Sequence, residues 1–175
     1  IRIFKLLDTK EMIVNNDKFK IENNISGKLK FKNLWFAYNE KNYVLKNINF
    51  KINPGNVLAI VGSTGSGKTS IINLINRFYE FNKGEIYLDE NKLRDYNLDQ
   101  LRKVIGYVPQ DVFLFSDTVR NNLTLGNKTI SDKKIWEVIH YLKAEKFIQK
   151  LPGKLNYNVM ERGATLSVGQ RQLLS

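Results

Sequence analysis

The 175-residue sequence contains no cysteine, a single histidine and no apolar run close to 18 residues. Without cysteine there is no disulfide and no thiolate metal ligand, which suits a reducing compartment. Without a long apolar run we expect no membrane-spanning helix and no signal peptide within these residues. Acidic residues are also few, since 28 Lys+Arg against 17 Asp+Glu give a net charge of +11. The lysines are scattered, which favours a solvated surface over a nucleic-acid or membrane-surface partner.

What the sequence does contain is a glycine-rich stretch, Gly62-Ser63-Thr64-Gly65-Ser66-Gly67-Lys68-Thr69. The apolar run 57–61 precedes it and apolar residues at helical spacing follow (Ile71, Ile75 and Phe78), which predicts strand, loop and helix. Glycines allow backbone N–H groups to turn inward around phosphate oxygens, and the helix N-terminus adds its unpaired donors. Lys68 would supply charge to the β- and γ-phosphates, and the Thr69 hydroxyl would ligate Mg²⁺. The stretch predicts a nucleoside triphosphate site; the alternative is a glycine-rich turn with an incidental lysine.

The segments before and after this stretch differ in the secondary structure that their residue patterns predict. Residues 1–8 have the spacing of the tail of an amphipathic helix, and the polar residues 9–28 are typical of a linker. Alternating apolar residues over 29–38 and 48–52 predict an antiparallel layer with one wet face. Further strands are expected at 84–88 and, fully buried, at 104–108.

Helix signals dominate the second half of the chain. Asn97 and Gln100 predict a capping box, and Ser131 an N-cap for a helix over 132–142, with another helix at 144–151. Near the end, Ser167 and Gln170 form a second capping-box pattern. The Ser167 hydroxyl, the Gly169 N–H and a helix N-terminus are equally consistent with a second anion site. Two such sites in one chain would hold one nucleotide from two sides.

Four motifs, in order, resemble those of the nucleotide-binding domain of an ATP-binding cassette (ABC) transporter. They are Phe36-Ala37-Tyr38 for the A-loop, 62–69 for Walker A, Val108-Pro109-Gln110 for the Q-loop and 166–170 for the signature. The resemblance covers roughly residues 29–175. Residues 115–123 and 161–163 are similar to the exporter branch, and residues 2–8 resemble the segment that joins an exporter's last membrane helix to its cassette.

The resemblance implies an α/β fold of the P-loop NTPase class. An ABC-type cassette has an antiparallel β subdomain, a RecA-like α/β core, incomplete in this sequence, and an α-helical subdomain, here at about 111–166. Residues 1–28 would be a linker from an upstream transmembrane domain. Residues 29–175 would form the N-terminal part of the nucleotide-binding domain.

The resemblance also implies individual roles. Tyr38 would stack on adenine, whereas the residue pattern alone also allows a core-facing aromatic. Lys68 and Gln110 would be catalytic, Gln110 by contacting Mg²⁺ and the attacking water, and Thr69 and Gln110 would ligate the metal. The residues implied to bind ATP are Tyr38, Gly62, Ser63, Thr64, Gly65, Ser66, Gly67, Lys68, Thr69 and Ser70, with Ser167, Gly169 and Gln170 closing over ATP on a partner cassette.

The implied partners are a second nucleotide-binding domain, identical or different and paired head to tail, and the transmembrane domains of the same transporter. The cassette would lie on the cytoplasmic face of the cell membrane and drive export as ATP binding closes the pair and hydrolysis reopens it. Phe113, Leu114 and Phe115 are candidate contacts to the membrane domain, or equally part of a helical-subdomain core. No nucleic-acid partner is expected.

The sequence departs from the family pattern in two ways. Val168 stands where the commonest signature has glycine, and residues 1–175 lack the family's Walker B aspartate, catalytic glutamate and switch histidine. His140 precedes the signature and is not that histidine. These residues by themselves are therefore expected to bind nucleotide weakly and not to hydrolyse it.

Two other functions remain open. One is a soluble ABC-type ATPase acting on nucleic acid, for which the charge of +11 is the argument and the absence of heptads between Gln110 and the signature the objection. The other is a degenerate regulatory cassette that binds ATP without hydrolysing it.

Overall fold

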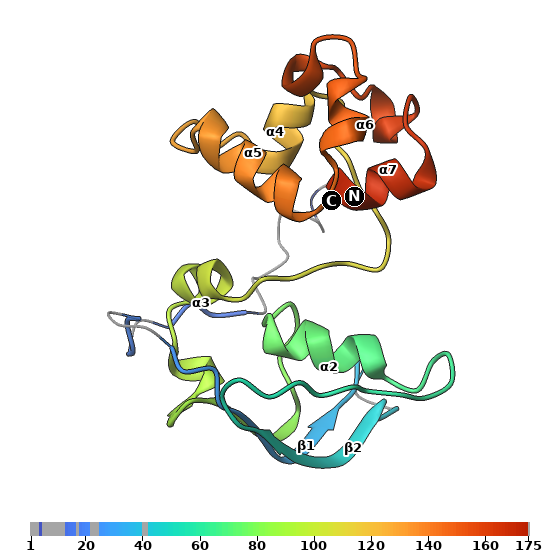
Figure 1. Ribbon diagram of the computed structural model, residues 1–175. Coiled ribbons are helices and arrows are strands. Elements are labelled where there is room, and N and C mark those ends of the chain that lie inside the picture. Colours follow the sequence, from blue (N-terminus) through green and yellow to red (C-terminus); the bar gives the residue numbers. More distant parts are fainter. Residues whose placement is uncertain (1–3, 5–12, 17, 22–24, 40–41, 175) are drawn as a thin grey trace. The chain divides into compact units, whose positions relative to one another are not determined.

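The computed structural model describes residues 4, 13–16, 18–21, 25–39 and 42–174. Its contacts divide the chain into two compact units, residues 1–107 and 108–175 (Figure 1). Of the helix tail predicted at residues 1–8, only Phe4 is described, and the rest of that prediction lies outside the described residues.

A four-stranded antiparallel sheet forms the base of the first unit. The strand order is β2-β1-β3-β4, with bounds Leu29–Phe36 for β1, Leu45–Ile52 for β2, Lys83–Leu88 for β3 and Asn91–Lys92 for β4. Phe31 of β1 lies opposite Phe50 and Ile86 on one face, and Lys30 lies opposite Lys51 and Tyr87 on the other. Apolar and charged residues thus alternate across the pleat. The antiparallel layer with one wet face is confirmed.

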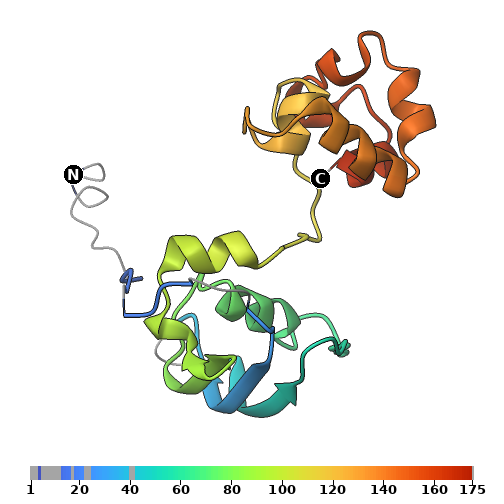
Figure 2. The same ribbon diagram turned by 60° about the vertical axis from the view of Figure 1, so that its left-hand side comes forward.

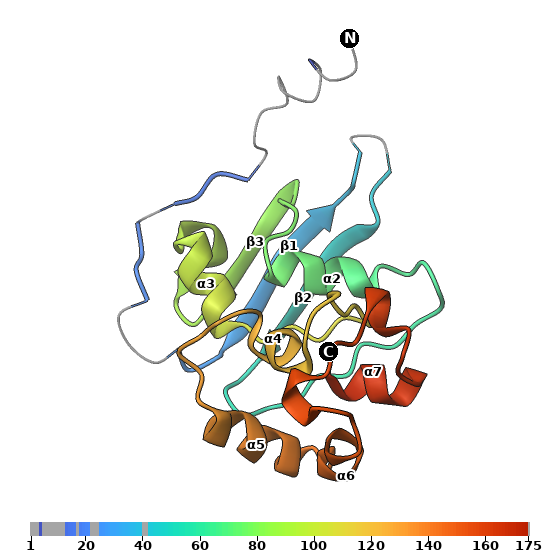
Figure 3. The ribbon, with the colours of Figure 1, turned by 90° about the horizontal axis from the view of Figure 1, so that it is seen from above.

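Helix α2, Lys68–Ile75, covers the apolar face of this sheet (Figure 3). Its residues Ile71 and Leu74 are 7% and 1% exposed and belong to the same core cluster as Phe31 and Phe36. The prediction that Ile71, Ile75 and Phe78 share one helix was wrong for Phe78, because the helix ends before Phe78, which is 41% exposed.

Two strand predictions were wrong. Residues 57–61 and 104–108 are not in strands: the first run has no regular secondary structure, with Val57 97% and Val61 88% exposed. Val104 instead ends helix α3, Leu98–Val104, and Val108 is 82% exposed. A β-strand is stable only when a neighbouring strand pairs with its N–H and C=O groups. Among the described residues neither run has such a neighbour.

The predicted capping box before α3 is half formed. The Asn97 side chain accepts a hydrogen bond from the Gln100 N–H at 3.0 Å, as predicted. The Gln100 side chain, however, accepts from the Ile21 N–H at 2.7 Å, since the Asn97 N–H donates to the Phe19 carbonyl. Residues from the predicted linker therefore contact the first unit, and Ile21 and Ile25 pack against its core. The domain boundary at residue 29 stays a prediction.

The second unit is helical (Figures 1 and 2). Ser131 caps α5 by accepting from the Lys134 N–H, which confirms the predicted N-cap. The predicted helices 132–142 and 144–151 are observed in shorter form. The bounds are Val119–Thr124 for α4, Asp132–Tyr141 for α5, Glu145–Gln149 for α6 and Val168–Leu174 for α7, with the 3₁₀ turns η1 Leu93–Asp95 in the first unit and η2 Lys154–Asn156 and η3 Glu161–Gly163 in the second.

Candidate functional site

The glycine-rich loop turns the chain sharply into α2. Gly65 and Gly67 have φ of 82° and 92°, a conformation that side chains with a Cβ rarely adopt. A Cβ on Gly67 would lie 2.7 Å from Leu45 Cδ2, so this glycine is also required by the close packing of the loop against β2. A Cβ on Gly65 would meet nothing within 4 Å. The open side of the loop is thus at Gly65.

Unpaired backbone donors gather along this loop. The Ser66 N–H donates to the Ser63 carbonyl at 3.2 Å, which closes a turn. The N–H groups of Gly65, Gly67, Lys68 and Thr69 have no acceptor among the residues that the structure describes. Together with the N-terminus of α2, these donors form the kind of concave anion site that binds phosphate.

The Lys68 ammonium lies across the loop. Its Nζ donates to the Gly62 carbonyl at 2.9 Å and to the Ser63 carbonyl at 2.8 Å. These are neutral acceptors, and an ammonium forms stronger bonds with phosphate oxygens. The lysine is therefore held at the loop by contacts that an anion can replace.

Tyr38 is fixed beside the start of α2. Its hydroxyl lies 2.9 Å from the hydroxyl of Ser70, which is 4% exposed. Its ring meets Phe36 and Tyr79 edge-on, with centroids at 4.7 and 4.9 Å, and the residue is 51% exposed. The ring is therefore not a core aromatic, and about half of the residue remains accessible. The bond to Ser70 was not foreseen from the sequence.

The polar side chains of the loop are exposed. Ser63, Thr64, Ser66 and Thr69 lie at the surface beside Gly62. No cluster of three or more histidine, cysteine or carboxylate side chains suited to a metal occurs in the described part of the chain. A hydroxyl such as that of Thr69 fits Mg²⁺, which commonly takes few protein ligands and several phosphate oxygens.

Gln110 is exposed and belongs to the second unit. A joint role of Thr69 and Gln110 at one metal ion stays a prediction. In the nearby run 113–115, Leu114 is 2% exposed in the helical core, whereas Phe113 and Phe115 are 60% and 56% exposed and meet edge-on at 5.0 Å. The core interpretation thus holds for Leu114, and a partner contact stays a prediction for both phenylalanines.

The signature residues open α7 with a complete capping box. The Ser167 hydroxyl accepts from the Gln170 N–H at 3.2 Å, and the Gln170 side chain accepts from the Ser167 N–H at 2.9 Å. The local structural prediction is confirmed. A Cβ on Gly169 would meet nothing within 4 Å, so the glycine is not required by packing within this unit. Its role toward a nucleotide stays a prediction.

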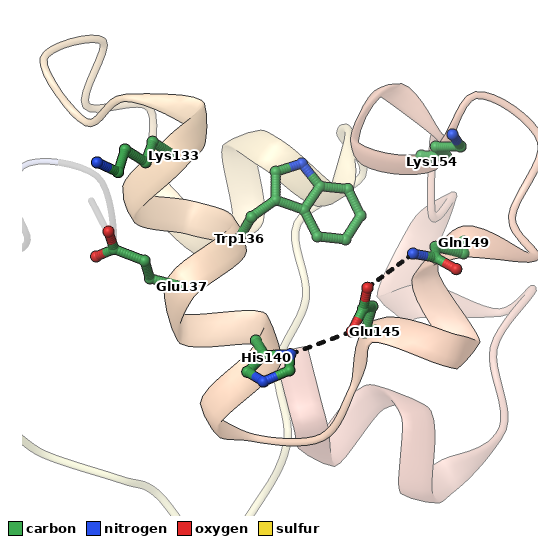
Figure 4. A pocket seen from close by; sticks show the side chains of 7 residues that line it. All are labelled: Lys133, Trp136, Glu137, His140, Glu145, Gln149 and Lys154. Carbon is green, nitrogen blue, oxygen red and sulfur yellow. Dashed lines mark hydrogen bonds and ion pairs between the residues drawn. The ribbon is translucent and has the colours of Figure 1, made fainter.

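A groove of about 490 Å³ on α5 and α6 is lined by residues that belong to none of these motifs (Figure 4). Trp136 forms one side. Glu145 Oε2 lies 3.2 Å from His140 Nδ1, and Glu145 Oε1 accepts a hydrogen bond from Gln149 Nε2 at 2.9 Å. No motif in the sequence predicted it.

Comparison with known proteins identifies the family in which this glycine-rich loop and this capped helix occur. Residues 45–175 match the family model described as ABC transporter. The chain belongs to the ABC transporter family. The cassette fold inferred from its motifs is thereby confirmed, with the antiparallel sheet and the helical unit as two of its parts.

Relatives support the same assignment. The chain is 41% identical over 174 residues to the "ATP-dependent lipid A-core flippase" of Syntrophus aciditrophicus, covering 99% of this chain and 29% of that protein. It is 37% identical over 174 residues to "Iron-sulfur clusters transporter ATM1, mitochondrial" of Kluyveromyces lactis, covering 99% and 24%. A solved "bacterial Atm1-family ABC exporter with ATP bound" aligns with a TM-score of 0.89 at 30% identity, covering 99% of this chain and 31% of the other.

The chain thus spans less than a third of the length of the relatives it matches. Within the described ranges, none of the helices has the length and apolar character needed to cross a bilayer.

Proposed function

We propose that this chain is the ATP-binding part of an export ATPase. The observation that carries the proposal is the glycine-lined turn before α2, where unpaired N–H groups and the Lys68 ammonium meet at one helix N-terminus. That arrangement suits a polyphosphate. Its place in an ABC family chain, and the exporter names of the relatives, favour ATP and transport over other uses of phosphate binding.

The residues present fit the nucleotide and its metal. The N–H groups of Gly65, Gly67 and Lys68 would bind phosphate oxygens, the Lys68 ammonium would offset the charge of the β- and γ-phosphates, and Tyr38 would stack on the base. Mg²⁺, when bound, would neutralise phosphate charge, with the hydroxyl of Thr69 and the amide oxygen of Gln110 as its protein ligands.

The proposed assembly is a pair of cassettes arranged head to tail, joined to transmembrane domains at the cytoplasmic face of a membrane. Ser167, Gly169 and Gln170 would close over ATP bound at the partner's loop. The capping box supports this role, because it holds the side chains of Ser167 and Gln170 together at the N-terminus of α7, the end of a helix that attracts anions.

The test uses the whole protein purified in detergent, with ATP and magnesium. We expect ATP binding and hydrolysis. In Lys68→Ala hydrolysis should fall at least about a hundredfold, because the positive charge that stabilises the transferred phosphate is removed. Lys103→Ala, an exposed lysine on α3, is the matched control and should retain wild-type turnover. Wild-type protein with no measurable ATP affinity would contradict the proposal.

We further propose that residues 1–175 by themselves show no turnover, because none of their carboxylates matches the Walker B aspartate or the catalytic glutamate that the family resemblance implies. ATPase activity of this segment that Lys68→Ala abolishes would show that the catalytic groups have been assigned wrongly.

A further inference from the structure

Arg77 is a buried cation at the exit of the phosphate-loop helix. It follows α2 by two residues, is 3% exposed and has a φ of 49°. Its N–H donates to the Leu74 carbonyl at 3.1 Å, so its backbone continues the hydrogen bonding of the helix. Burying an arginine is costly unless its donors are paired, so its partners are informative.

The guanidinium of Arg77 joins separate parts of the chain. Its Nε and Nη2 donate to Glu80 Oε1 at 3.2 and 3.0 Å, and its Nη1 donates to the Tyr96 carbonyl at 3.2 Å. Nη2 also donates to the Val14 carbonyl at 3.1 Å. The planar fork of an arginine reaches these acceptors at once, which a lysine ammonium cannot do.

The Val14 carbonyl belongs to a docked segment, defined as residues 13–16 and 18–21, that runs beside α3 (Figure 2). The Leu98 N–H donates to Asn15 Oδ1 at 2.8 Å, and the Phe19 N–H donates to the Asp95 carbonyl at 3.0 Å. Phe19 pairs with Tyr96 as a parallel β-bridge.

Burial contributes little at the start of this segment and more at its end. Val14 is 73% exposed and Phe19 40% exposed, whereas Ile21 is partly buried and packs against the core of the first unit. A segment held mainly by hydrogen bonds at the surface opens at low free-energy cost. The loss of a single buried anchor therefore changes how often it opens.

We infer that Arg77 is a positioning residue that couples the phosphate-loop helix to the docked segment. The inference rests on the proposed function, because coupling to nucleotide has meaning only if ATP binds at the loop. Lys68 and Thr69 begin α2 and Arg77 follows its end, so a change in the helix position on binding ATP moves the guanidinium and the Val14 carbonyl with it. Such coupling is reciprocal, and a pull on the docked segment alters ATP affinity.

The test is hydrogen exchange on the whole protein, comparing wild type, Arg77→Gln and Arg94→Gln. Arg94 is the matched control, because its Nε donates to Glu80 Oε2 at 2.9 Å and its guanidinium forms no hydrogen bond or ion pair with the described residues of the docked segment. Without nucleotide, the amides of Phe19 and Ile21 should exchange about tenfold faster in Arg77→Gln, since a charged hydrogen bond is lost. Arg94→Gln should leave their exchange within about twofold of wild type.

A second arm adds ATP with magnesium. Wild type should show slower exchange both at 62–69 and at 18–21, whereas Arg77→Gln should keep the first change and lose the second. Equal effects of both arginine variants, or an unaltered response of 18–21 in Arg77→Gln, would overturn the inference. No protection of 62–69 in wild type would instead contradict the proposed function, and the nucleotide-free arm would still test Arg77.

Arg77→Lys keeps the charge for Glu80 but not the fork. This variant replaces Arg77→Gln in the test if Arg77→Gln does not fold. It should also lose the slower exchange of residues 18–21 that ATP causes in wild type. Retention of wild-type coupling in this folded variant would exclude a role for the fork.

Discussion

The hydroxyl of Tyr38, two residues after the end of β1, lies 2.9 Å from that of Ser70 in the first turn of α2. Ser70 is buried and Tyr38 is half exposed, so the bond fixes the hydroxyl end of a ring that solvent still reaches. The ring therefore keeps a set position relative to the phosphate loop, whose Lys68 and Thr69 directly precede Ser70.

Replacement of Tyr38 tests whether this ring stacks on the base of ATP. Tyr38→Ala should weaken ATP binding to the whole protein by about 1–3 kcal/mol, the usual contribution of base stacking on an aromatic ring. Tyr38→Phe keeps the ring and should lose about 1 kcal/mol or less. Equilibrium titration with ATP and magnesium measures both. Tyr79→Phe is the control, because no partner of the Tyr79 hydroxyl is found in the described residues. Wild-type affinity in Tyr38→Ala would exclude stacking.

Gly169 allows folding and function to be separated. Its backbone is not in the left-handed region and an added Cβ would meet nothing within 4 Å. Gly169→Ala should leave the stability of the chain unchanged or raise it by up to about 1 kcal/mol, since alanine favours helix. If this surface closes over ATP on a partner cassette, the methyl group should nevertheless lower ATPase activity of the whole protein at least about tenfold. Urea unfolding and steady-state ATPase assays measure the two effects. Full activity would place the ATP contact elsewhere.

Local patterns predicted the parts of the fold that depend on local causes. The alternation in β1 and β2, and the caps formed by Asn97, Ser131 and Ser167, follow from residues adjacent in sequence. Residues 57–61 have the composition of a strand, but strand pairing requires a neighbour, and composition does not report whether one is present. The prediction failed there for that reason.

The phosphate loop was predictable because its function depends on glycines and a lysine at fixed spacing. Arg77 and Asn122 were not singled out, because their importance comes from burial and from partners that no spacing rule identifies, such as the Val14 carbonyl. From sequence alone, an arginine two residues after a helix and an asparagine within one are both expected at the surface.

The side chain of Asn122 stabilises the turn at residues 115–118, which directly precedes α4. It is 7% exposed; its Oδ1 accepts from the Phe115 N–H at 2.8 Å, and its Nδ2 donates to the carbonyls of Phe115 and Thr118 at 3.1 and 3.0 Å. Asn122→Ala should lower the free energy of unfolding by about 2–4 kcal/mol, because the Phe115 N–H loses its acceptor and the carbonyls of Phe115 and Thr118 each lose one of two donors. Asn121→Ala, which removes one bond to Asp117 at 2.9 Å, should cost about 1 kcal/mol. Urea denaturation measures both, and equal losses would contradict this stabilising role.

Asp89 should make the stability of the first unit depend on pH. Burial by itself raises the pKa of this carboxyl, but hydrogen bonds from the Ser26 hydroxyl and from the N–H groups of Ser26, Lys28 and Gly27 outweigh it, so the pKa lies below its usual value. A carboxylate with a lowered pKa stabilises the fold fully above the unfolded-state value, near pH 4. That stabilisation disappears as the pH falls through the folded-state pKa.

Asp89→Asn isolates this contribution, since asparagine tolerates the φ of 55° at this position but presents an NH₂ group to hydrogen-bond donors. The variant should be less stable than wild type at pH 7, by an amount that stays constant down to about pH 5 and shrinks below about pH 4. Urea unfolding between pH 2 and 7 measures the difference. Asp99→Asn, at an exposed carboxyl in the first turn of α3, is the control and should show a much smaller difference. A difference in unfolding free energy between wild type and Asp89→Asn that is unchanged at pH 2 would mean that the side chain acts through its shape rather than its charge.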